Sequence, residues 1–198
     1  SNWILDLDIS LDLVNNASEG SSLTTAGGTT ISCDTPDAMI EGADIISIKR
    51  TADRATSENG SLSSNIRYVD EQWYLRLSDQ RSEKAWVYVA DNASIESDDL
   101  TAGSDVDYWA YFTKIFFLKE DDGTPSLCAF ELKGGELNES CFVDGIENIQ
   151  IELGIDSDGD ATPDIFKSSP TASEMDDVVV ARFYILARSP QQIPNYTN

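Results

Sequence analysis

Four aspartates lie within nine positions of the stretch GIDSDGDATPDIF, residues 154–166, and mostly small residues separate them. Carboxylates that alternate along a short loop can surround a hard divalent cation with oxygen ligands, and such loops typically hold calcium. The stretch therefore predicts a calcium site. Its expected ligands are the carboxylates of Asp156, Asp158, Asp160 and Asp164 and the backbone carbonyl of Thr162.

The helix-loop-helix calcium motif is excluded for this stretch. That motif has glycine at its sixth position and a bidentate glutamate at its twelfth, where this chain has Ala161 and Lys167. A second interpretation is a turn without metal, in which aspartate side chains accept hydrogen bonds from nearby backbone N–H groups. Both interpretations fit the residues, and the mutual repulsion of four crowded carboxylates favours the cation.

The charge balance and the lack of histidine exclude several classes of function. The chain has 36 acidic and 13 basic residues, a net charge of −23, so nucleic acids and anionic membrane surfaces are repelled as partners. With no histidine, neither a Ser-His-Asp triad nor a Cys-His pair nor a histidine zinc site can form. Pairs of carboxylates remain possible catalysts, but nothing singles one pair out among 36 acids. We therefore predict that the protein is not an enzyme.

Apolar and polar residues alternate along most of the chain, which is typical of half-buried β-strands. The opening stretch WILDLDISLDLV, residues 3–14, predicts one strand with two unlike faces. The apolar face has Trp3, Leu5, Leu7, Ile9, Leu11 and Leu13, and the solvated face has Asp6, Asp8, Ser10 and Asp12. Further strands are expected at 43–51, 71–79, 84–91, 108–120, 126–133, 136–143, 147–155 and 178–188. We expect a mainly β fold with antiparallel sheets, in a single domain over residues 1–198.

Aromatic residues gather in four patches, around Trp73, Trp86, Trp109 and Phe116. They could form a platform on which sugar rings stack. Filling of the core is the favoured interpretation, because Trp73, Leu75 and Leu77 share one face of an alternating strand.

Two of the three cysteines lie at matching positions of a predicted hairpin. The stretch CAFELKGGELNESC folds back on itself at Gly134-Gly135, a pair that a two-residue primed turn prefers. In that register Cys128 faces Cys141, where a cross-strand disulfide can form, and such a bond implies an oxidising compartment. Two buried free thiols are the alternative, and Cys33 has no evident partner.

The run CFVDGIENIQIELGIDSDGDATPDIF, residues 141–166, resembles the minor pilin W (PilW) family of bacterial type IV pili. A second stretch, VVVARFYILARS at residues 178–189, resembles the strand that follows in that family, and a looser similarity extends back to residue 41. Ala161 departs from the family, which often has glycine there. The positions that carry the resemblance are Val143, Gly145, Glu147, Asn148, Gln150, Gly154, Asp156, Asp158, Gly159, Asp160, Arg182, Arg188 and Ser189.

This resemblance implies a non-catalytic minor pilin that helps to prime assembly of the pilus and forms part of its tip. Its implied partners are other minor pilins and a tip adhesin. The family also has an apolar N-terminal helix, which would make the full-length protein α+β and anchor it in the bacterial inner membrane, facing the periplasm, before it reaches the pilus tip at the cell surface. We expect contact with the membrane only through that helix.

Two other functions fit parts of the sequence. One is a subunit like pseudopilin J of type II secretion, which shares the same assembly principle. The other is a secreted, calcium-stabilised β-domain that binds carbohydrate. An N-terminal prepilin cleavage site followed by an apolar helix would favour a pilin, whereas a plain secretory signal would favour the carbohydrate-binding domain.

Overall fold

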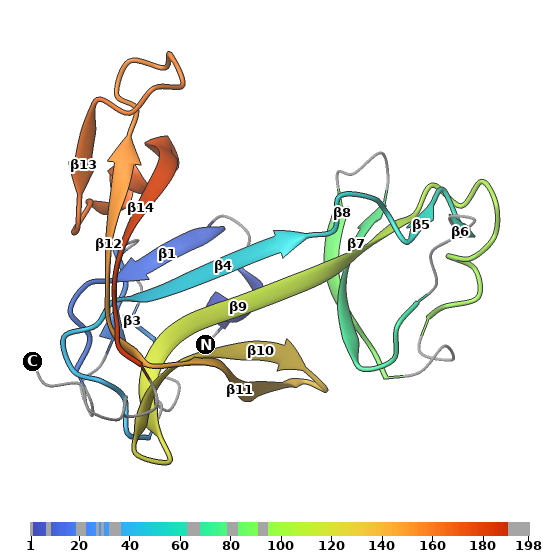
Figure 1. Cartoon of the computed structure of the whole chain (residues 1–198). Helices are drawn as coiled ribbons and strands as arrows, with labels where there is room; N and C mark the ends of the chain where they lie inside the picture. The colour runs from blue at the N-terminus through green and yellow to red at the C-terminus, as the bar shows by residue number, and fades with distance from the viewer. Residues whose placement is uncertain are drawn as a thin grey trace, which may run out of the picture. The chain divides into compact units, whose positions relative to one another are not determined.

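The fold is built almost entirely from antiparallel strands (Figure 1), as the alternation of the sequence predicted. In this computed structural model the described residues are 2–6, 9–18, 23–26, 28, 30–31, 37–62, 68–78, 83–90 and 95–189. Cys33 lies outside these residues. Among them, no helix has both the length and the apolar character needed to cross a membrane.

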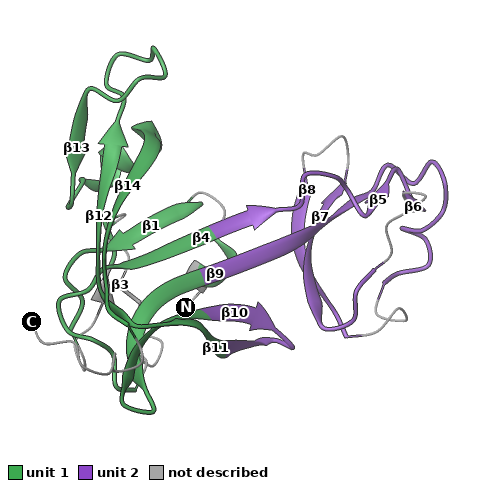
Figure 2. Ribbon diagram, viewed as in Figure 1, with its two compact units in different colours: residues 1–48, 115–129, 139–198 green, residues 49–114, 130–138 purple. Residues whose placement is uncertain are grey.

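The chain forms two compact units (Figure 2), one of residues 1–48, 115–129 and 139–198 and the other of residues 49–114 and 130–138. The boundaries between the units fall inside four strands rather than in loops. These strands are β4 (Ile45–Thr51), β9 (Asp107–Asp121), β10 (Thr124–Lys133) and β11 (Glu136–Asp144). The expectation of a single domain stays a prediction.

The first unit contains the elements that carry the acidic loop. Its main sheet follows the order β1-β4-β9-β10-β11, with β1 at Leu11–Val14, and a separate three-stranded sheet follows the order β13-β12-β14. The remaining elements of this unit are η1 (Asn2–Leu5), β2 (Leu23–Thr24), β3 (Thr30–Ile31), β12 (Ile146–Ile155), β13 (Ile165–Lys167), η3 (Ala172–Asp177) and β14 (Val178–Ala187).

The second unit is built around a three-stranded antiparallel arrangement in which β7 (Gln72–Ser78) pairs with both β8 (Glu83–Val89) and β9. Two short strands, β5 (Ser57–Glu58) and β6 (Ser61–Leu62), pair with each other beside β9. The strands expected at 71–79, 84–91 and 108–120 are therefore confirmed.

The prediction of one strand over residues 3–14 was wrong. Residues Asn2–Leu5 form a 3-10 helix. Within the described part of this stretch, which leaves out residues 7 and 8, the strand covers Leu11–Val14, the four residues that pair with β4. Asp12, expected on a solvated face, is 1% exposed, and its carboxylate accepts the N–H of Leu13. Alternation is a local pattern, and a strand also needs a neighbour to satisfy its backbone groups.

The core of the first unit forms where the main sheet meets β12. Ile149, Ile151 and Leu153 alternate along β12 and are all buried, so one face of that strand supplies the core. Leu13, Ala43, Ile46 and Leu118 complete this cluster from β1, the segment before β4, β4 itself and β9.

The core of the second unit is centred on tyrosines. Tyr74, Tyr108 and Tyr68 contact one another edge to face, with ring centroids 5.2 to 6.4 Å apart. This tyrosine cluster lies on the Tyr74 side of β7. Leu75 and Tyr111 are buried on the Trp73 side, so that face is also covered, as the alternating pattern predicted. On the Trp73 side the aromatic rings pack against each other, Trp73 on Tyr88 and Trp86 on Tyr111.

The hairpin of β10 and β11 has the predicted turn and the predicted disulfide. β10 ends at Lys133 and β11 begins at Glu136, and Gly134 and Gly135 both have the positive φ angles, 63° and 79°, that a primed turn requires. Cys128 and Cys141 are bonded, with their Cα atoms 3.9 Å apart. The bond fastens β10 to β11 within the first unit.

A buried carboxylate, that of Asp44, joins β12 to the start of β4. One oxygen of Asp44 accepts the N–H of Asn16 at 2.8 Å, and the other accepts the N–H of Ile151 at 2.6 Å. The N–H of Asp44 donates to the carbonyl of Ile149 at 2.9 Å. Burial raises the pKa of Asp44, and these two N–H donors oppose that rise by stabilising the charged form.

We predict that Asp44→Ala lowers the free energy of unfolding by about 3 kcal/mol, because two backbone N–H groups lose a charged acceptor inside the protein. Denaturant unfolding measures this change. Asp98→Ala is a matched control, since Asp98 is exposed, and it should change stability by less than about 0.5 kcal/mol. Equal effects of the two substitutions would contradict the role assigned to Asp44.

Candidate functional site

The acidic loop connects β12 to β13 and begins with a buried carboxylate. Asp156 is 8% exposed and accepts three backbone N–H groups of the loop, from Asp158 at 3.2 Å and from Gly159 and Ala161 at 2.7 Å each. Burial raises the pKa of Asp156, but these N–H donors together lower it by more, so the net shift is downward. The N–H groups of the loop therefore stabilise the charged form of the carboxylate, and the carboxylate in turn fixes the path of the loop backbone.

The end of the loop is fixed by Asp164. Its carboxylate accepts both the hydroxyl of Ser157, at 2.5 Å, and the N–H of Ser157, at 2.8 Å. The hydroxyl and then the N–H lower the pKa of Asp164. The N–H of Asp164 itself donates to the carbonyl of Ile155, which closes the loop against the last residue of β12.

Of the four predicted carboxylate ligands, three converge and one does not. Asp156, Asp158 and Asp164 each have a carboxylate oxygen within 4.8 Å of the others, a spacing that one cation could bridge. Asp160 lies outside this group, and its carboxylate instead accepts the N–H of Thr162 at 2.7 Å.

The loop therefore supports both interpretations of its sequence. Backbone N–H groups already stabilise Asp156 and Asp164, as an acidic turn without metal requires. The grouping of Asp156, Asp158 and Asp164 is also a partial oxygen cage, in which calcium would need further ligands from water or backbone carbonyls. Calcium stays a prediction.

Lys167 and Ala161, the two residues that exclude the helix-loop-helix motif, each have a defined conformation or contact in the structure. The Nζ atom of Lys167 donates to Glu174 on η3 at 2.6 Å. Ala161 has a φ angle of 66°, the left-handed region that favours glycine, so the residue type that the PilW resemblance led us to expect there is also the unstrained one.

Several positions that carry the family resemblance perform structural tasks in β12. The side-chain amide of Gln150 donates to the carbonyl of Gly42 at 2.7 Å and to the Asn148 side chain at 3.0 Å. Glu147 forms an ion pair with Arg188 at 3.3 Å. These contacts attach β12 to the segment before β4 on one side and to the residue after β14 on the other.

The two glycines of the motif occupy crowded or turning backbone. Gly154 has no space for a side chain, since a Cβ atom would lie 2.5 Å from Val180 and 2.9 Å from Pro163. Gly145 has a φ of 83°, its N–H donates to the carbonyl of Pro125, and its carbonyl accepts the N–H of Arg188. Gly154 therefore allows close approach of β14, and Gly145 allows the turn from β11 into β12.

Arg182 and its neighbours lie on the outward face of β12 and β14. The guanidinium is 3.3 Å from Glu152 on the paired position of β12, and it lies 3.6 Å above the ring of Phe166 on β13. Tyr184 donates its hydroxyl to the same Glu152 at 2.9 Å. This polar network crosses all three strands of the small sheet.

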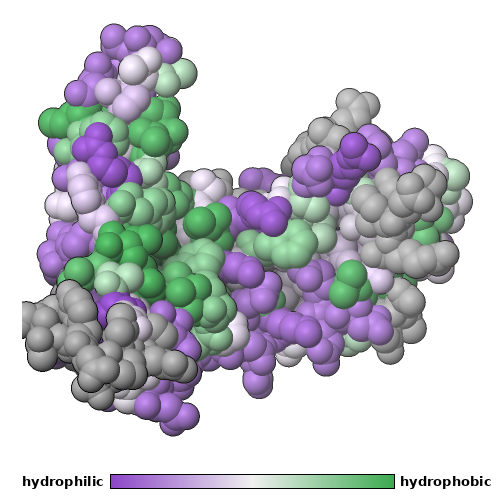
Figure 3. All heavy atoms as spheres, in the orientation of Figure 1, coloured by the Kyte–Doolittle hydropathy of each residue, from purple (hydrophilic) through white to green (hydrophobic). Residues whose placement is uncertain are grey.

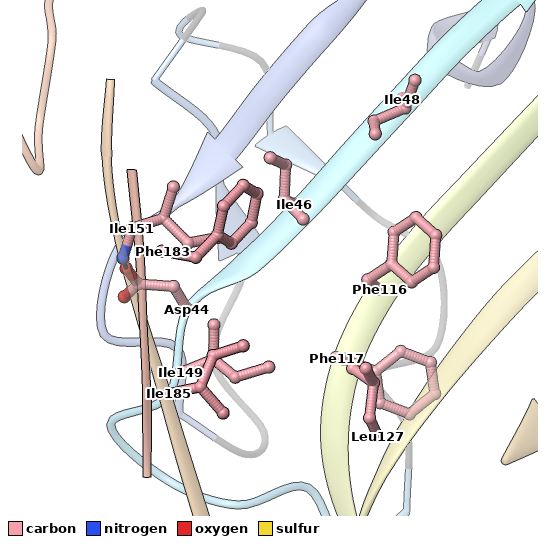
Figure 4. A pocket seen from close by; sticks show the side chains of 10 residues that line it. All are labelled: Asp44, Ile46, Ile48, Phe116, Phe117, Leu127, Ile149, Ile151, Phe183 and Ile185. Carbon is pink, nitrogen blue, oxygen red and sulfur yellow. Dashed lines mark hydrogen bonds between the residues drawn. The ribbon is translucent and has the colours of Figure 1, made fainter. Parts of the chain in front are cut away.

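An apolar groove of about 280 Å³ lies on the opposite face (Figure 4). Ile149, Ile151 and Ile185 line it from the small sheet, and other apolar side chains line it from β4, β9 and β10. Asp44 is the single charged residue in the lining, and its oxygens are occupied by backbone donors. The sequence reasoning did not foresee this groove, because its two walls are far apart along the chain.

The second unit contains a polar network that the sequence also did not indicate. The guanidinium of Arg76 binds both oxygens of Asp99, at 2.7 and 2.8 Å, and Tyr108 donates its hydroxyl to Asp99 at 2.6 Å. The side chain of Arg76 is the main cause that lowers the pKa of Asp99, and burial is the main cause that raises the pKa of Tyr108. Every charged or hydroxyl group in the network is paired, which indicates a structural role.

Residues 115–198 match the sequence profile of the family described as Type IV Pilus-assembly protein W. The match confirms the resemblance found in residues 141–166 and 178–189. Neither the curated proteins nor the solved structures contain a match to this chain.

We predict that calcium raises the melting temperature of the protein more than magnesium does at the same concentration. A bound cation stabilises the folded state by about 2.7 kcal/mol when its concentration is a hundred times the dissociation constant. Magnesium should do less, because it needs a tighter octahedron and keeps its water ligands. Thermal melts with each ion and with monovalent salt at matched ionic strength measure the difference.

The structure supplies a matched pair of variants for this experiment. Asp158→Asn should remove the calcium-specific rise, because Asp158 belongs to the converging group, whereas Asp160→Asn should keep it. Equal shifts with calcium and magnesium, unchanged by Asp158→Asn, would show that the loop is an acidic turn without a calcium site.

We also predict that Ala161→Gly stabilises the protein by about 0.5–1 kcal/mol. Glycine relieves the strain of alanine in the left-handed region, and this gain exceeds the cost of the greater conformational entropy that glycine has in the unfolded chain. The bond from this residue's N–H to Asp156 is retained in the variant. Ala102→Gly is the control, since Ala102 is exposed and does not have a positive φ, and it should be neutral or destabilising. Denaturant melts measure both, and a destabilised Ala161→Gly variant would contradict the prediction.

Proposed function

We propose that this protein is a non-catalytic minor pilin that takes part in the assembly of a bacterial type IV pilus. The observation that carries the proposal is the match of residues 115–198 to the Type IV Pilus-assembly protein W family. This span contains β12, the acidic loop and β14, which are the elements with the residues that suggested the family.

The contacts of these residues support a role without catalysis. Gln150, Asn148, Gly145 and Gly154 serve backbone positioning and close packing, and Arg182 belongs to a saturated surface network. An active site usually needs a reactive group with an activating partner. The residues that mark the family are instead used to hold three strands together.

The proposed location is the cell envelope, with the globular domain in the periplasm before assembly and at the pilus tip afterwards. The disulfide between Cys128 and Cys141 supports this location, because such bonds persist in oxidising compartments such as the periplasm. The proposed partners are other minor pilins and a tip adhesin, with which the protein would prime the growing fibre.

We predict that deletion of the gene for this protein strongly reduces pili on the cell surface while the major pilin still accumulates in the cells. The reason is that a priming subunit acts before polymerisation and not on synthesis of the major pilin. Shearing of surface fibres, followed by quantification of the major pilin in the sheared and cellular fractions, measures the effect.

Complementation provides the control. The wild-type gene and the stable Asp98→Ala variant should both restore the fibres. Unchanged surface pili in the deletion strain would contradict the proposed function, as would turnover of a substrate by the purified protein that one carboxylate substitution abolishes.

A further inference from the structure

The turn between β5 and β6 contains Asn59-Gly60, the single asparagine of the chain that is followed by glycine. Such an asparagine deamidates readily, because glycine has no side chain to hinder its backbone nitrogen from approaching the asparagine Cγ atom. Asn59 is exposed to solvent. Figure 3 shows a largely hydrophilic surface over the described residues of the second unit, to which this turn belongs. Sequence and exposure alone therefore indicate a reactive site.

The fold itself requires this reactive pair of residues. Asn59 and Gly60 have φ angles of 50° and 73°, the left-handed values that a two-residue primed turn needs. Asparagine is one of the few residues besides glycine that adopt such angles easily. At Gly60 no other residue fits, because a Cβ atom would overlap the carbonyl oxygen of Thr101 and the hydroxyl of Ser104. The hairpin therefore keeps an asparagine next to a glycine despite its chemistry.

Three hydrogen bonds attach the turn to residues 105–107, at the start of β9. The N–H of Gly60 donates to the carbonyl of Val106 at 2.9 Å. The side-chain oxygen of Asn59 accepts the N–H of Asp105 at 2.9 Å, and the N–H of Asn59 donates to the carboxylate of Asp107 at 2.9 Å. Both the backbone and the side chain of Asn59 are therefore fixed by the same short segment.

These bonds prevent the first step of deamidation. That step requires the backbone nitrogen of Gly60 to lose its proton and to approach the Cγ atom of Asn59 in a reactive orientation. In the structure the proton is held in the bond to Val106, and the side chain of Asn59 is held by Asp105. Ring closure therefore needs the turn to separate from residues 105–107.

We propose that Asn59 is a deamidation site that the folded second unit protects and that reacts when this turn opens. In the open turn, the deprotonated nitrogen of Gly60 attacks Cγ of Asn59. The new N–Cγ bond replaces the Cγ–Nδ2 bond, and the amide nitrogen leaves as ammonia. Water then opens the resulting succinimide at one of its two carbonyls, which gives aspartate or isoaspartate. Water is the only co-reactant, and the proton lost by Gly60 passes to solvent.

Either product prevents the turn from closing as before. Isoaspartate adds a methylene group to the main chain, so the two-residue turn no longer fits the pairing of Ser57 with Leu62. Aspartate places a second carboxylate beside that of Asp107, which accepts the N–H of residue 59, and the two charges repel each other. A brief opening of the turn thus becomes permanent. This inference concerns the second unit alone and is independent of the proposed role in pilus assembly.

The first test incubates the whole chain at one pH in native buffer and in urea, and follows each asparagine by mass spectrometry of peptides. In urea Asn59 should deamidate faster than any other asparagine of the chain. In native buffer its rate should be lower by about tenfold or more, because only the open turn reacts. Equal rates in the two solutions, or a slow reaction of Asn59 in urea, overturn the proposal.

A matched pair of variants tests the hydrogen bonds. Asp107→Ala removes the acceptor of the Asn59 N–H and should accelerate deamidation of the folded chain, whereas Asp107→Asn keeps a side-chain oxygen there and should react as the wild type does. An unchanged rate in a folded Asp107→Ala variant overturns the proposal. Should that variant not fold, hydrogen exchange of the Gly60 amide in the wild type decides, because this nitrogen is the nucleophile. Its exchange and the deamidation rate should rise together as urea is added below the unfolding transition, and a deamidation rate that does not follow overturns the proposal.

The last measurement concerns the product. Protein deamidated in urea is refolded, separated from unmodified chain and compared with untreated protein by hydrogen exchange. The amides of Gly60 and Asp105 should exchange faster in the modified protein, since their acceptors are displaced. Equal exchange in the two samples shows that the turn closes again, and this result overturns the conclusion that the opening is permanent.

Discussion

The first unit depends on one buried carboxylate, that of Asp44, which holds two backbone segments that the sequence separates by more than a hundred residues. Asp44 accepts the N–H groups of Asn16, two residues after β1, and of Ile151, in the middle of β12, and its own N–H donates to Ile149. Burying a charge costs free energy unless the charge is well hydrogen-bonded, and the two N–H donors offset this cost for the Asp44 carboxylate. The apolar core from Leu13 to Leu153 forms where these bonds place the small sheet against the main one.

The residues that mark the family extend the same constraint along β12. The side-chain amide of Gln150 donates to the carbonyl of Gly42, two residues before Asp44. This hydrogen bond and the one from Ile151 to the Asp44 carboxylate therefore join the same two segments, β12 and the residues around the start of β4. Gly154 then lets Val180 approach closely enough for β14 to pair with β12. A motif that first suggests chemistry is thus explained by the packing of three strands.

The sequence predicted most strands, the glycine turn and the disulfide, because alternation and two-residue turns are local signals. It failed for Trp3–Leu5, which belong to a 3-10 helix, and for Asp12, whose burial depends on what packs above it. The choice of Asp156, Asp158 and Asp164 over Asp160 required the path of the loop in space. Asp44 and the apolar groove were missed because both join segments that are distant in the sequence.

The acidic loop and the edge of β14 are connected through the end of β12. The N–H of Asp156 donates to the carbonyl of Asp177, the residue immediately before β14, and Gly154 packs against Val180 near its start. Whatever fixes the loop, whether its own N–H groups or a cation, therefore also fixes the first residues of β14. The conformation of the acidic loop is thus coupled to the position at which β14 begins.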